Sequence, residues 1–70
     1  MSKYYAIREL LRVEVDIKQQ GFVETFLRDI ERRHMQDEFC DQYKKFLDVG
    51  FSPYDSLIAF MKGKNNENYL

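Results

Sequence analysis

The side chains best suited to nucleophilic or metal chemistry are His34 and Cys40, the single histidine and the single cysteine of the chain. On one helix their six-residue spacing would separate them by about 9 Å along the axis. That distance is too long for a base to take a proton from a thiol directly. Glu38 would share a helix face with His34, but these residues lack the second ligand pair that a zinc site needs. We therefore expect no catalytic residue, no metal and no cofactor, so the protein is not expected to be an enzyme.

The densest basic group of the sequence consists of Arg28, Arg32 and Arg33. Arg28 and Arg32 would lie one helical turn apart, so their guanidinium groups could together contact phosphate or an acidic protein surface. Asp29 and Glu31 are interleaved with these arginines and are expected to dilute their charge. The arginines are thus candidate partner-binding residues.

Composition limits the kind of partner. The net charge is −1, which provides no overall field to attract nucleic acid or an anionic membrane. The chain is 44% hydrophobic and 16% aromatic, so it is expected to fold. One cysteine excludes an internal disulfide and favours the reducing cytoplasm. No apolar run approaches the roughly 20 residues that span a bilayer.

The spacing of apolar residues predicts an all-α fold, a compact bundle of three to four helices forming one domain over residues 1–70. The join between the second and third helices is open, since it contains neither glycine nor proline. Residues 64–70 are polar for most of their length and are expected to fray. The expected helices lie near 3–20, 22–35, 37–49 and 53–62.

The first of these segments carries two conflicting patterns. Ser2 suits the N-cap of a helix with an apolar face. Alternation of apolar and polar residues near 12–17 is instead typical of a half-buried strand. We favour the helix because a lone strand has no pairing partner here, and a short strand near 12–17 is the alternative. Gln19, Gln20 and Gly21 are expected to end the helix, since glycine suits the left-handed residue after a helix end. The expected apolar face consists of Tyr4, Ile7, Leu10, Leu11 and Ile17.

The segment from Gly50 to Pro53 indicates a helix stop followed by a helix start. Gly50 suits the residue after a helix end, and Ser52 followed by Pro53 has the form of an N-cap and first helical residue. Phe51 lies in this turn, where it either fills the core or projects as a binding anchor. A helix-turn-helix unit is therefore expected in the C-terminal third.

Residues 43–70 resemble a ubiquitin-associated domain. The resemblance rests on Val49-Gly50-Phe51, where that family has a Met-Gly-Phe or Met-Gly-Tyr loop, on the small residues Ser56 and Ala59, and on the following Phe60 and Asn65-Asn66. It implies a three-helix-type interaction module whose Gly50-Phe51 loop contacts a partner.

These observations together predict a small non-enzymatic protein that binds another protein as an adaptor or inhibitor. A chain this small suits a phage or mobile element, and a homodimer is a further possibility because so short a chain buries little surface. The alternative is a helix-turn-helix DNA-binding regulator. The charge balance disfavours it, and so does the helix near 53–62, which offers an acid, a tyrosine and apolar groups, with Lys62 and Lys64 only at its far end. The candidate partner-binding residues are Gly50, Phe51, Tyr54, Arg28, Arg32 and Arg33.

Overall fold

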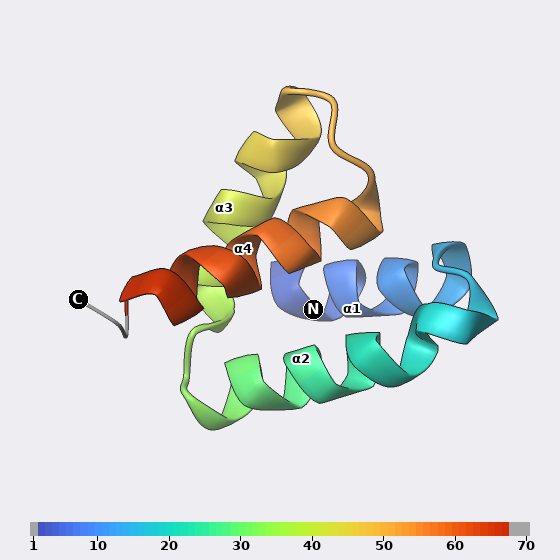
Figure 1. Ribbon diagram of the computed structural model, residues 1–70, viewed down its shortest axis with the longest axis horizontal. Coiled ribbons are helices and arrows are strands. Elements are labelled where there is room, and N and C mark those ends of the chain that lie inside the picture. Colours follow the sequence, from blue (N-terminus) through green and yellow to red (C-terminus); the bar gives the residue numbers. More distant parts are fainter. Residues whose placement is uncertain (1, 68–70) are drawn as a thin grey trace.

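The computed structural model describes residues 2–67, which form four α-helices and one short 3₁₀ helix (Figure 1). They are α1 (Lys3–Glu14), η1 (Ile17–Gln19), α2 (Gln20–Arg32), α3 (Gln36–Asp48) and α4 (Pro53–Glu67). The predicted all-α bundle is confirmed, and no strand occurs in residues 2–67. α1 and α2 run antiparallel, while α4 returns from the α3–α4 turn to pack on the other three helices.

Phe39 lies at the centre of the core. Its side chain is fully buried, and its ring contacts the rings of Tyr4, Tyr43 and Phe60 at centroid distances of 6.2, 5.4 and 5.3 Å. These edge-on and tilted contacts join α1, α3 and α4. Aliphatic side chains of α2 complete the core: Val23, Leu27 and Ile30.

Two of the expected helix starts are confirmed. The Ser2 hydroxyl accepts a hydrogen bond from the backbone N–H of Tyr5 at 3.3 Å, as an N-cap does. At the start of α4 the Ser52 hydroxyl accepts the N–H of Asp55 at 3.1 Å, and Pro53 is the first helical residue. These caps satisfy helix N-terminal donors that would otherwise lack partners.

The end of the first helix differs from the expectation. α1 ends at Glu14, six residues before the predicted boundary, and Gly21 lies inside α2. The Gln20 side-chain amide donates to three carbonyl oxygens at the end of α1, those of Leu11, Arg12 and Val15, at 3.2, 3.0 and 2.8 Å. A side chain from the next helix therefore caps α1, so no glycine is needed there.

Residues 12–17, in which apolar and polar residues alternate, do not form a strand. Leu11 and Val15 are buried, whereas Val13 is 80% and Ile17 84% exposed. The buried pair has the four-residue spacing of a helix face. Leu10, expected on the core face, is also exposed. The core side of α1 is therefore narrower than predicted.

The sequence left undecided whether the second and third helices are continuous; in the structure they are separated by a turn at His34. His34 adopts a left-handed φ of 56°. Its N–H donates to the carbonyl of Glu31 at 3.2 Å, and the N–H of Met35 donates to that of Ile30 at 3.0 Å. This pair of bonds is a Schellman motif, with histidine at the position where glycine is usual.

The last helix is longer than expected. α4 continues through Gly63 to Glu67, whereas the sequence predicted an end near residue 62. Residues 68–70 of the expected frayed tail lie outside the described residues. Within residues 2–67, no helix combines the length and the apolar character that crossing a membrane requires.

Candidate partner-binding surfaces

The α3–α4 turn has a fixed backbone. Gly50 has a φ of 103°, and its N–H donates to the carbonyl of Leu47 at 3.0 Å. The N–H of Phe51 donates to the carbonyl of Phe46, also at 3.0 Å. These bonds form a second Schellman motif, in which Gly50 occupies the left-handed position that other residues adopt only with strain.

Phe51 is held between the core and the solvent. Its ring stacks on that of Phe46 with centroids 5.2 Å apart, the apolar contact that commonly accompanies a Schellman motif. It is 42% exposed, and the exposed Leu47 and Val49 belong to the same turn. Tyr54 is half-buried and packs against the core. The turn therefore presents an apolar surface.

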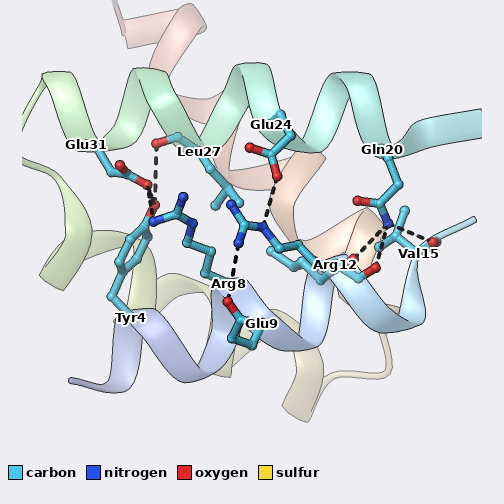
Figure 2. A network of polar contacts seen from close by, with 10 residues as sticks. Tyr4, Arg8, Glu9, Arg12, Val15, Gln20, Glu24, Leu27 and Glu31 are labelled. Atoms are coloured by element: carbon cyan, nitrogen blue, oxygen red, sulfur yellow. Dashed lines mark hydrogen bonds and ion pairs between the residues drawn. The ribbon is translucent and has the colours of Figure 1, made fainter. Parts of the chain in front are cut away.

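Two acids of α2, Glu24 and Glu31, face α1 (Figure 2). The Tyr4 hydroxyl donates to Glu31 Oε2 at 2.5 Å, and the Arg8 guanidinium lies 3.6 Å from the same oxygen. One end of the helix pair is joined in this way, and at the other end Arg12 Nε donates to Glu24 Oε1 at 3.0 Å. Burial, and next the hydrogen bond to Glu31, raise the pKa of Tyr4, so its hydroxyl remains a donor. Both carboxylates thus serve contacts within the bundle.

The three arginines lie outside this network. Asp29 accepts a hydrogen bond from Arg32 and forms an ion pair with Arg33, whose Nε lies 3.2 Å from Asp29 Oδ2. Arg28 is exposed and forms no ion pair within residues 2–67. Glu31 lies one helical turn from Arg28, but its carboxylate is engaged by Tyr4 and Arg8 of α1. Asp29 is the acid that does accompany them.

The structure divides the six candidate residues between two places. Gly50, Phe51 and Tyr54 lie at the α3–α4 turn, at the edge of the molecule away from α2, whereas Arg28, Arg32 and Arg33 lie on α2 and at its end (Figure 1). A partner that contacts only one face would meet one set and not the other.

A cavity of about 620 Å³ separates the start of α1 from the α2–α3 junction, and both His34 and Cys40 line it. Burial raises the pKa of the Cys40 thiol, and the carboxylates of Asp37 and Asp41 raise it further. The nucleophilic thiolate is therefore disfavoured. Residues 2–67 contain no group of three side chains arranged to hold a metal ion.

Phe22 is not among the residues singled out from the sequence. It is the first residue of the predicted second helix, and its side chain is 58% exposed and stacks on Phe26, with ring centroids 6.4 Å apart. Periodicity shows which residues share a stripe, but not where its buried part ends.

Comparison of the chain with protein-family models, with curated proteins and with solved structures gives no match, so the resemblance of residues 43–70 to a ubiquitin-associated domain stays a prediction.

Proposed function

We propose that this protein is a non-enzymatic module that binds another protein as an adaptor or inhibitor, with the α3–α4 turn as part of its contact surface. The observation that carries the proposal is the half-exposed ring of Phe51 on a backbone fixed by two hydrogen bonds. Aromatic side chains dominate the energetics of protein interfaces when partner atoms cover them. The cytoplasm is the proposed place of action, and a phage or mobile element suits a chain of this size.

Preorganisation supports this use of the turn. Ordering a loop and its side chains costs free energy during association. Here the Schellman bonds of Gly50 and Phe51 and the stacking on Phe46 already restrict the turn in the free protein. A partner that covers the exposed part of Phe51, together with Val49, would gain apolar contact at little ordering cost.

Electrostatics favours a protein partner over DNA. In a helix-turn-helix regulator, α4 would be the recognition helix, and its N-terminal residues would meet base edges. Asp55 is exposed in that first turn and would repel phosphate. The basic residues Arg28 and Arg32 lie on α2, away from that end of α4.

The test is a comparative pull-down from an extract of the native host. Wild-type protein, Phe51→Leu and the matched surface control Val13→Ala are immobilised, and captured proteins are quantified by mass spectrometry. We expect a protein that wild type and Val13→Ala retain and that Phe51→Leu loses. Calorimetry with that purified protein should show affinity about ten-fold weaker for Phe51→Leu.

Two outcomes contradict the proposal. Equal capture by folded Phe51→Leu would remove the turn from the contact surface. Salt-sensitive retention on duplex DNA, with no protein captured, would favour the DNA-binding alternative.

A further inference from the structure

A groove lies between α2 and α4 on the flank of α2 that faces away from α1. It has a volume of about 390 Å³ and an apolar part formed by Phe26 and Met61. One helical turn before Phe26, the exposed ring of Phe22 stacks on it and extends the apolar surface. The remaining lining residues are polar or charged: Thr25, Arg28, Asp29 and Arg32.

The fold separates the charges of α2 and leaves this groove basic. Glu24 and Glu31 point toward α1, where arginines and Tyr4 engage them (Figure 2). Asp29 is the carboxylate that lines the groove, and its two oxygens already form ion pairs with Arg32 and Arg33. Two guanidinium groups therefore line the groove beside one carboxylate that is already engaged.

We propose that this groove binds an acidic segment of a partner protein, which places an apolar side chain against Phe26 and Met61 and its carboxylates on Arg28 and Arg32. The inference rests on the proposed function in taking the partner to be a protein, and it assigns the contact to a surface separate from the α3–α4 turn. Arg28 and Arg32 lie one turn apart on α2, so carboxylates with helical spacing can meet both.

The arginines of the groove favour a partner segment that carries carboxylates. A guanidinium offers a planar fork that pairs with a carboxylate through two parallel hydrogen bonds. Arg32 is 77% exposed and Arg28 has no ion pair within residues 2–67, so both can turn toward a ligand without breaking a buried contact. The wild-type groove would thus gain interactions that the free protein lacks.

The same groove is poorly suited to nucleic acid. Its apolar part, Phe26 and Met61, matches an aliphatic or aromatic side chain, and Asp29 would repel a phosphate placed between the arginines. The net charge of −1 adds no long-range attraction for a polyanion. Carboxylates beside an apolar anchor fit both features.

The test uses a fluorescein-labelled helical peptide in which glutamates lie beside leucine and phenylalanine on the same face. Fluorescence anisotropy measures its binding to the full chain, and amide NMR shifts locate the site. Two control peptides carry glutamine for glutamate, or serine for the apolar residues. The protein variants are Arg28→Glu combined with Arg32→Glu, and Phe22→Ser. Lys44→Glu on α3 is a single charge-reversal control, and Val13→Ser on α1 is the apolar control.

We expect shifts confined to α2 and α4, and affinity weakened at least about ten-fold by the double arginine variant, with a smaller loss for Phe22→Ser. Lys44→Glu, Val13→Ser and Phe51→Leu should bind like wild type. Because Phe51→Leu leaves this groove intact, the groove can be confirmed even if the turn fails its own test.

Three results would overturn the inference. The first is no binding of the acidic peptide to the folded wild-type protein. The second is equal affinity in folded Arg28→Glu/Arg32→Glu. The third is equal binding of the serine control peptide, duplex DNA or heparin, which would make the groove a general polyanion surface.

Discussion

Replacing Phe51 by alanine should lower the free energy of unfolding by about 2 kcal/mol. Truncating a fully buried phenylalanine costs about 3–5 kcal/mol. Phe51 is 42% exposed, so somewhat more than half of that contact is at stake, chiefly the stacking on Phe46. In a domain this small, each kcal/mol corresponds to a melting-temperature shift of about 4–8 °C. Thermal unfolding followed by circular dichroism should therefore show a decrease of roughly 10 °C.

Two companion variants separate the role of the ring from that of the turn. Phe51→Leu keeps an apolar side chain over Phe46 and should cost about 1 kcal/mol. Val49→Ala removes only atoms that are largely exposed and should leave stability nearly unchanged. A loss near 4 kcal/mol in Phe51→Ala would mean that the ring belongs to the core. A loss below about 0.5 kcal/mol would mean that the Phe51 ring contributes nothing to folding. Either value would refute the placement of Phe51 between the core and the solvent.

Further predictions concern backbone conformation and pH. Gly50→Ala should destabilise the protein by about 1–2 kcal/mol because residue 50 has a φ of 103°. Gly63→Ala should stabilise it by about 0.5–1 kcal/mol, because Gly63 lies in the interior of α4 and the added Cβ meets nothing within 4 Å. Urea titrations of the two variants measure both changes. His34→Gly should stabilise the α2–α3 turn by about 0.5–1 kcal/mol by relieving a left-handed φ of 56°, and an unchanged urea midpoint would contradict that strain. Because the pKa of Tyr4 is raised in the folded state, the unfolded chain releases its proton first above pH ~10, so stability falls there as pH rises. Tyr4→Phe should lose less stability over that range.

Local signals in the sequence predict several helix boundaries correctly. Ser2, Ser52 with Pro53, and Gly50 each act through hydrogen bonds to residues within four positions along the chain. Such contacts are encoded by neighbouring residues, so a reading along the chain can find them. The predicted helix end at each of these residues therefore agrees with the structure.

Boundaries that depend on distant contacts were predicted wrongly or left open. α1 ends where the Gln20 amide reaches its carbonyls, an interaction across five to nine residues that leaves no distinct mark in composition. The α2–α3 break has histidine rather than glycine in the left-handed position. The partly buried Met35, which packs against the core, supports a turn conformation that local preference alone disfavours.

The candidate surfaces show the same division between local and spatial information. A charge count over residues 22–36 gives three arginines against three acids and no net charge. The fold turns Glu24 and Glu31 toward α1, and only then do the arginines form a basic surface. A charge count along the chain cannot show where these glutamate side chains point, because that depends on which side of α2 faces α1.

The exposed apolar side chains follow from the size of the bundle. An amphipathic helix needs an apolar stripe at least about 100° wide to pack on its neighbours, but four short helices cannot cover every stripe from edge to edge. Leu10, Val13 and Phe22 lie at the uncovered margins of α1 and α2. Of these, Phe22 stacks on a residue that lines a groove together with two arginines, of which Arg28 forms no ion pair within residues 2–67. Apolar surface beside a directional polar group is what distinguishes a specific binding site from leftover hydrophobic area, so the α2–α4 flank is the margin with the stronger claim to a partner.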